Sequence, residues 1–302
     1  MHMAVIEVHD LTKRFGEVVA VDGLSFELGE GTVTGFLGPN GAGKTTTLRM
    51  LLGLVSPTSG RATIMGRPYA ELTEPAKRVG AVLEASAFHP GRRAVDHLRM
   101  VATAAGLPPR RAGEVLEMVG LAGDGRRRVK GFSLGMRQRL SLATALLGDP
   151  RVLILDEPAN GLDPEWIQWL RRFVRERADD GCTVVVSSHV LAEVAQTVDD
   201  VLVIARGRLV AHAPLTSLID HTAATVRVRT PQAEALRDLL ASSGHTAELR
   251  APDVVVALDT TTEEIGLAAA SRGIVIYEMT AEHASLEDTF FQLTAGAKGE
   301  AR

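Results

Sequence analysis

One short segment of the chain carries the residue types that bind a polyphosphate. Residues 38–45 read Gly-Pro-Asn-Gly-Ala-Gly-Lys-Thr and fit the pattern G-x-x-x-x-G-K-[ST] in full. Glycines let backbone N–H groups converge on phosphate oxygens, and the helix that follows adds a positive partial charge at its first turn. Lys44 is expected to reach the β and γ phosphates, and the Thr45 hydroxyl to ligate Mg²⁺. The candidate nucleotide-binding residues of this loop are Gly38, Asn40, Gly41, Ala42, Gly43, Lys44, Thr45 and Thr46.

Two carboxylates follow a second apolar run, Val152–Leu155. Asp156 is expected to hold Mg²⁺, directly or through water. Glu157 is expected to act as the general base that polarises the attacking water. Taken alone, such a pair could be a solvated turn after a strand, but the phosphate loop upstream favours hydrolysis of a nucleoside triphosphate.

The elements that must position these groups alternate along the first two thirds of the chain. Residues 32–37, 152–155, 183–187 and 201–205 are almost continuously apolar, which is typical of parallel strands covered on both faces. Residues 44–54 have the pattern of a helix that opens at the phosphate loop. The sequence therefore predicts an α/β core of the P-loop type.

Two smaller parts are predicted around this core. Residues 6–8 and 25–28 alternate as antiparallel strands do, and 79–83 forms a further short strand. Helical patterns then dominate, which indicates a helical subdomain at about 85–150 within a first domain at 1–215.

A second, small α+β domain is predicted at about 220–295. Its expected strands are 225–229, 254–258 and 274–277, and its expected helices are 231–241, 262–271 and 285–293. Because it holds no phosphate loop, metal-ligand cluster or catalytic constellation, dimer stabilisation or regulation is its expected role.

Composition excludes several classes of protein. Among 302 residues the net charge is −4, whereas a broad nucleic-acid-binding surface needs a basic excess. The single cysteine, Cys182, cannot form a disulfide within the chain and indicates a reducing compartment. It is expected to be a buried core residue, with a reactive thiol as the alternative.

The sequence also lacks the apolar stretch of about 18 residues that a membrane span needs. Its first residues, Met1–Met3, lack the apolar core of a signal peptide. We therefore expect a cytoplasmic protein that reaches a membrane only through a partner.

Residues 133–138, Ser-Leu-Gly-Met-Arg-Gln, resemble the L-S-G-G-Q signature of the nucleotide-binding subunits of ABC transporters. The resemblance extends from about Val5 to Ala213. Ser133 and Gly135 match the serine and the second glycine, whereas Leu134 and Met136 depart from the glycine and glutamine of the consensus. This variant is similar to the drug- and peptide-export branch, which includes the bacitracin- and daunorubicin-resistance type.

The resemblance implies roles for the signature residues. Ser133, Leu134, Gly135 and Met136 would face the γ-phosphate of ATP bound to the other subunit of a head-to-tail homodimer. A small hydroxyl and a glycine at the start of a helix suit an anion. A serine at that position is also an ordinary helix cap, and that alternative stays open.

Further positions follow from the same resemblance. His189 corresponds to the switch histidine, which contacts the γ-phosphate and orients Glu157. Gly161 and Asp163 belong to the D-loop, which crosses the dimer interface. Phe15 corresponds to the aromatic residue that stacks on adenine, although it could instead be a core residue.

Glu84 occupies a position where most relatives have a glutamine that ligates Mg²⁺ and links ATP to the membrane partner. A carboxylate is a better ligand than an amide for a hard cation. We therefore expect Glu84 to sense the metal, as in the export branch that carries the same exchange.

Together these features predict an ATP- and Mg²⁺-dependent ATPase that drives export through a separate transmembrane permease. It would lie on the inner face of the cell membrane and bind no nucleic acid. A soluble ABC ATPase acting on DNA or ribosomes is one alternative, and a non-catalytic interaction subunit is another. Arg126–Arg128 and Lys130 are interpreted as a solvated basic turn, with a role near phosphate or lipid left open.

Overall fold

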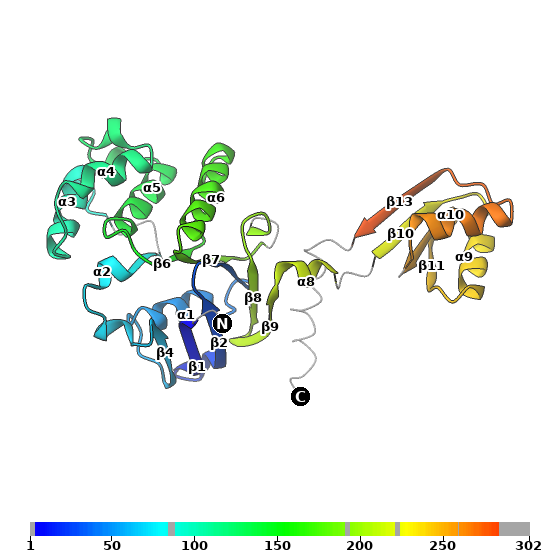
Figure 1. The fold of residues 1–302 in the computed structure, drawn as a ribbon, viewed down its shortest axis with the longest axis horizontal. Coiled ribbons are helices and arrows are strands. Elements are labelled where there is room, and N and C mark those ends of the chain that lie inside the picture. The colour runs from blue at the N-terminus through cyan, green and yellow to red at the C-terminus, as the bar shows by residue number, and fades with distance from the viewer. Residues whose placement is uncertain (1–3, 84–87, 191–193, 221–223, 259, 284–302) are drawn as a thin grey trace. The chain divides into compact units, whose positions relative to one another are not determined.

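The computed structural model describes residues 4–83, 88–190, 194–220, 224–258 and 260–283. The chain forms two compact units, of which the first extends to Leu215 and the second begins at Thr216 (Figure 1). In the described residues no helix is both long enough and apolar enough to cross a membrane.

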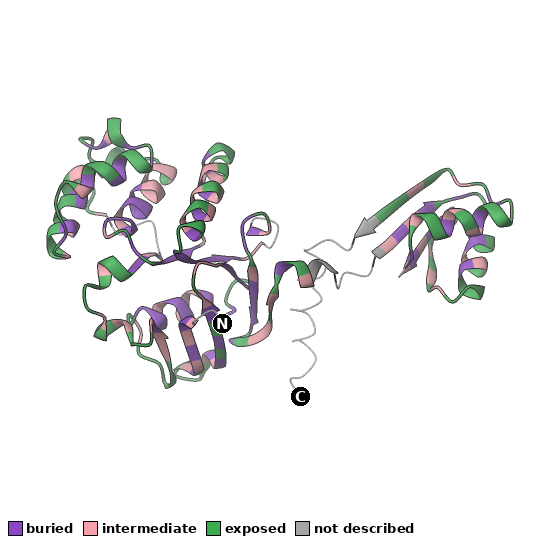
Figure 2. Ribbon diagram, in the orientation of Figure 1, coloured by how far each residue is buried: buried purple, intermediate pink, exposed green. Residues whose placement is uncertain are grey.

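A six-stranded sheet forms the centre of the first unit, in the order β5-β6-β7-β3-β8-β9. Its strands are parallel except for β9, which pairs antiparallel with β8. All residues of β3 and β6 are buried, as expected for apolar strands covered on both faces (Figure 2). The strands are β3 (Val33–Leu37), β5 (Val79–Val82), β6 (Val152–Asp156), β7 (Thr183–Ser188), β8 (Asp200–Ala205) and β9 (Arg208–Pro214).

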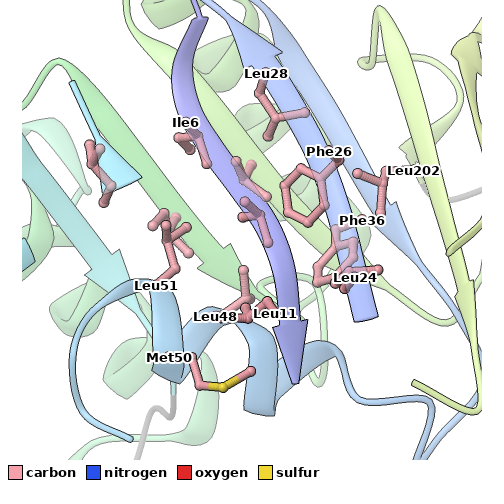
Figure 3. Close-up of a cluster of buried hydrophobic side chains, with 14 of the residues drawn as sticks. Ile6, Leu11, Leu24, Phe26, Leu28, Phe36, Leu48, Met50, Leu51 and Leu202 are labelled. Carbon is pink, nitrogen blue, oxygen red and sulfur yellow. The ribbon is translucent and has the colours of Figure 1, made fainter. Parts of the chain in front are cut away.

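A three-stranded antiparallel sheet of order β2-β1-β4 lies against α1. It consists of β1 (Ala4–Phe15), β2 (Val18–Gly29) and β4 (Ser59–Ile64). Ile6 and Leu11 of β1 pack with Phe26, Phe36 and Leu48 in one apolar cluster (Figure 3). This cluster fixes the start of α1, where the phosphate loop ends.

Helix α1 spans Lys44–Leu51 and is shorter than the predicted helix at 44–54. Gly53 has a φ of 67°, and a glycine in the left-handed region is a common end of a helix. The apolar residues after Leu51 therefore belong to the turn rather than to the helix.

The helical subdomain contains α3 (Ala94–Ala104), α4 (Arg111–Met118) and α5 (Leu134–Ala145), which group together in Figure 1. Asp163 caps α6 (Pro164–Asp179), because its side chain accepts a hydrogen bond from the Trp166 N–H at 2.8 Å. The remaining short elements of this unit are α2 (Pro75–Arg78) and the 3₁₀ turns Tyr69–Glu71, Ala122–Asp124 and Val129–Gly131. Helix α8 (Leu215–Asp220) begins at the last residue of the first unit and continues into the second.

The second unit has the order β-α-β-β-α-β and one antiparallel sheet, β11-β12-β10-β13. This is the ferredoxin-like, split βαβ topology. Val226, Leu236, Val255 and Ile265 contribute to its core. Its elements are β10 (Ala224–Arg229), α9 (Ala233–Ser242), β11 (Ala247–Ala251), β12 (Val254–Leu258), α10 (Thr262–Ser271) and β13 (Glu278–His283).

The predicted strand at 274–277 is wrong. The last strand of the second unit begins at Glu278, and Ile274 instead buries its side chain in the core of that unit from the preceding loop. An apolar run of four residues has no period that separates a strand from a buried loop. The predicted helix at 285–293 lies outside the described residues.

Cys182 is buried, with 3% of its surface exposed. Burial raises the pKa of its thiol to about 11, so the thiolate that a reactive cysteine needs is disfavoured. The structure thus supports a core role for Cys182.

Candidate ATP-binding and hydrolysis site

The phosphate loop joins the end of β3 to the start of α1. Lys44 is the first residue of α1 and is 6% exposed. Its Nζ donates a hydrogen bond to the Gly38 carbonyl at 2.6 Å and lies 3.5 Å from the carbonyl oxygen of Pro39. The ammonium group is therefore held over its own loop, where a phosphate could replace these carbonyls.

Two glycines of the loop have no room for a side chain. A Cβ at Gly43 would lie 2.5 Å from the Ala20 carbonyl oxygen, and Gly43 has a φ of 106°. A Cβ at Gly38 would lie 2.5 Å from the Ile204 carbonyl oxygen. Close packing on two strands thus requires glycine at both positions.

Asp156 ends β6 and is 8% exposed. The Thr45 hydroxyl donates a hydrogen bond to its Oδ2 at 2.7 Å. The Ser187 hydroxyl, on the neighbouring strand β7, donates to its Oδ1. Both carboxylate oxygens of Asp156 are therefore satisfied at the edge of the phosphate loop.

Glu157 follows in the left-handed region, with a φ of 49°. Its backbone N–H donates to the Ser187 hydroxyl at 2.9 Å. Its Oε1 lies 3.4 Å from Lys44 Nζ, and its Oε2 lies 2.9 Å from His189 Nδ1. The carboxylate is thus held between a lysine of the phosphate loop and the histidine that follows β7.

These groups surround one pocket of about 290 Å³. Its walls are formed by Ala20, Asn40, Gly41, Ala42, Gly43, Lys44, Thr45, Thr46, Glu157, Asn160 and His189. The structure therefore brings residues of the phosphate loop, Glu157 and His189 together around one pocket.

The signature segment lies outside that pocket. Ser133 caps α5 by accepting the Met136 N–H at 3.2 Å, so the helix-cap interpretation is confirmed as one of its roles. The side chain of Leu134 reaches within 2.5 Å of the position that a Cβ on Gly161 would occupy. The Gln138 amide donates to the Asn160 carbonyl. The signature segment and the D-loop of one chain are thus packed together.

Arg139, on the same helix α5, adds a second contact between the signature segment and the D-loop. Its guanidinium lies 3.7 Å from the Asp163 carboxylate and 4.0 Å from the centre of the Trp166 ring. Trp166 in turn stacks on Trp169, with ring centres 4.0 Å apart. The start of α6 is therefore fixed to α5 by a cation–π contact and an ion pair.

Comparison with known proteins agrees with this geometry. Residues 21–160 match a family model described as ABC transporter, and residues 224–287 match a domain of unknown function (DUF8746). The bacitracin transport ATP-binding protein BcrA of Bacillus licheniformis is 44% identical over 217 residues, which cover 71% of each chain. The protein of the same name from Enterococcus faecalis is 33% identical over 298 residues and 97% of each chain.

The chain belongs to the ATP-binding subunits of ABC transporters. As a member of this family it is an ATPase whose hydrolysis of ATP powers transport. The fold agrees, because a solved ATP-binding subunit of an ABC transporter superposes with a TM-score of 0.64 at 24% identity, covering 88% of this chain and 99% of that one.

The residues of this ABC subunit fit one Mg²⁺ ion together with a nucleotide. In the described ranges, no group of three or more His, Cys, Asp or Glu residues could hold a metal alone. Thr45 and Asp156 already share a hydrogen bond, and Mg²⁺ commonly takes one or two protein oxygens and completes its shell with phosphates and water. Glu84, the third predicted ligand, lies outside the described residues.

Sequence reasoning missed Ser187 and did not include Ala20 or Asn160 in the site. Ser187 joins Asp156 to the backbone of Glu157, and its signal was a hydroxyl at the carboxyl end of an apolar strand. Phe15 does not line the pocket. Phe15 is 52% exposed as a residue, and Lys13 Nζ lies 4.9 Å from the centre of its ring, so it is not a core residue.

Proposed function

We propose that this subunit drives export of a drug, antibiotic, lipid or similar compound through a separate transmembrane permease. The observation that carries the proposal is the convergence of Lys44, Glu157 and His189 on one pocket beside the Thr45–Asp156 pair. Export is inferred from the variant signature, the glutamate at position 84 and the resemblance to the drug- and peptide-export branch.

Within one subunit, Lys44 and the loop N–H groups would bind the β and γ phosphates, and Thr45 and Asp156 would hold Mg²⁺ with Glu84. The metal would supply charge neutralisation on the phosphates. Glu157 would accept the proton of the attacking water. His189 would hold the Glu157 carboxylate in place, which its 2.9 Å contact supports.

Two subunits would close head to tail around two ATP molecules. Ser133, Leu134, Gly135 and Met136 would then meet the γ-phosphate on the partner, and Gly161 and Asp163 would cross the interface. The exposure of Ser133 and Leu134 at the start of a 12-residue helix supports this role, because a helix N-terminus attracts anions. Adenine would stack on the exposed ring of Phe15.

In this proposal ATP is the ligand whose contacts favour the closed dimer, and its hydrolysis shifts the population back to the open state. The subunit would lie peripherally on the cytoplasmic face of the cell membrane, where the helical subdomain meets the permease. The domain at 220–295 would stabilise or regulate the dimer.

Size-exclusion chromatography of the purified Glu157→Gln variant tests the closure. The amide keeps the shape of the carboxylate and removes the base, so bound ATP should persist. We expect a monomer without nucleotide and a dimer with Mg-ATP.

The matched control is the double variant Glu157→Gln/Ser133→Arg. This protein should still bind ATP but should not form the dimer. A Glu157→Gln protein that binds Mg-ATP and stays monomeric would refute dimer closure by the isolated subunit. A dimer that survives Ser133→Arg would refute the role of the signature segment.

A further inference from the structure

Two basic segments, residues 92–93 and 126–130, are separated by more than 30 residues in the sequence but lie side by side in the fold. The Val129 N–H donates to the Arg92 carbonyl at 3.0 Å, and the Lys130 N–H donates to the Pro90 carbonyl at 2.9 Å. Arg93 and Arg128 form an antiparallel bridge. The backbone thus holds the two segments in register.

This pairing gathers five cations, which we call the basic patch: Arg92, Arg93, Arg126, Arg128 and Lys130. All are exposed except Arg92, which is half-buried. None forms an ion pair with any residue in the described part of the chain.

Arg127, in the middle of the second segment, differs from its neighbours. Its guanidinium pairs with Asp124 at 2.7 Å and lies 5.9 Å from the centre of the Phe132 ring. Val129 and Phe132 are buried beneath the segment. One arginine and two apolar side chains therefore anchor the turn, which leaves the patch residues free to face a ligand.

The patch contrasts with the composition of the chain, whose net charge is −4. Burial lowers the pKa of His97 on α3, and the charge of Arg92 lowers it further. A local cluster of unpaired cations on an otherwise acidic protein produces a positive surface potential that attracts anionic partners.

We propose that the basic patch binds the anionic head groups of a membrane surface. Long side chains that are exposed, apart from half-buried Arg92, suit a diffuse layer of negative charge, as juxtamembrane basic clusters do. This contact would hold the subunit at the membrane independently of nucleotide and of the permease.

Co-sedimentation of the purified full-length chain with lipid vesicles tests the proposal. We expect binding to vesicles of phosphatidylglycerol and phosphatidylcholine, no binding to phosphatidylcholine alone, and loss of binding as salt is raised. Each cation contributes about fivefold to such partitioning, so R126Q/R128Q/K130Q should lower it by on the order of 100-fold.

Two further variants distinguish the anionic lipid surface from a general charge effect and from an acidic peptide. R61Q/R67Q/R172Q removes three exposed arginines elsewhere in the same unit, so it changes net charge equally and should bind nearly as wild type. R126K/R128K keeps the positive charge and should still bind anionic vesicles. Binding of an acidic peptide would be lost in this variant if it depended on bidentate contacts between arginine and carboxylate.

Equal binding by wild type and R126Q/R128Q/K130Q would overturn the proposal, as would wild-type binding that ignores lipid charge. Failure of the wild type to bind any vesicle would overturn it too. If co-purification with the permease were then lost only in R126Q/R128Q/K130Q, the patch would dock an acidic protein segment instead.

Discussion

Replacing Ser187 with alanine removes the hydroxyl that joins the two carboxylate residues of the site. Ser187 is fully buried, donates to Asp156 and accepts the Glu157 N–H at 2.9 Å. A hydrogen bond to a charged group contributes about 1.5–3 kcal/mol, and an unpaired buried N–H costs about 1–3 kcal/mol. We therefore expect the free energy of unfolding to fall by about 3 kcal/mol.

The same substitution should slow ATP hydrolysis. Glu157 occupies the left-handed region, which costs a non-glycine residue about 1–2 kcal/mol and needs support from neighbours. Without the Ser187 hydroxyl the Glu157 carboxylate should leave its position between Lys44 and His189, and kcat should fall at least about tenfold, which corresponds to roughly 1.4 kcal/mol.

Thermal unfolding and steady-state ATP turnover measure the two effects. At about 2–4 °C per kcal/mol, the melting temperature of the first unit should drop by roughly 6–12 °C. Ser141→Ala is the control, because it removes another buried serine hydroxyl on α5, away from the pocket. A Ser187→Ala protein with unchanged melting and turnover would refute the reasoning, and lower stability with unchanged kcat would refute the positioning role alone.

Two further predictions follow from local geometry. Gly43→Ala should prevent nucleotide binding and destabilise the nucleotide-free protein, because its Cβ would lie 2.5 Å from the Ala20 carbonyl. Gly41→Ala is the control, because its Cβ would have open space, and its positive φ should lower the free energy of unfolding by only about 1–2 kcal/mol. Equal melting temperatures for the two variants would contradict this prediction. The pKa of the Cys182 thiol is raised to about 11 by burial. Cys182 should therefore resist alkylation near neutral pH in the native protein and react rapidly in denaturant, as mass spectrometry would report. Rapid labelling of the native protein would contradict this, because it would mean that the segment just before β7 opens locally.

The groups of the site that are neighbours in the sequence were predictable from it. The phosphate loop is a local pattern, and Asp156 and Glu157 follow a strand whose apolar character is unmistakable. Ser187 was not predictable in the same way, because its importance depends on the register of β6 against β7, which pairs it with Asp156. Pairing of distant strands is a tertiary property that one residue type does not encode.

The strands that sequence reasoning missed share one property. β4, β9, β11 and β13 all lie at the edge of a sheet. Edge strands carry polar and charged side chains that discourage pairing with other chains, so they lack the apolar signal by which central strands are found. The strand wrongly predicted at 274–277 is the opposite case, because the short apolar run there belongs to a loop that it anchors to the core.

The stack at the start of α6 gives the molecule a built-in optical reporter. Both tryptophans of the sequence lie there, and the ring of Trp166 lies against Arg139 of α5. Indole emission responds to nearby charge and to water, so the tryptophan fluorescence of the folded chain comes from the seam between the signature segment and the D-loop. A spectral change on adding nucleotide would thus report on that seam without any label and without a tryptophan contribution from the second unit.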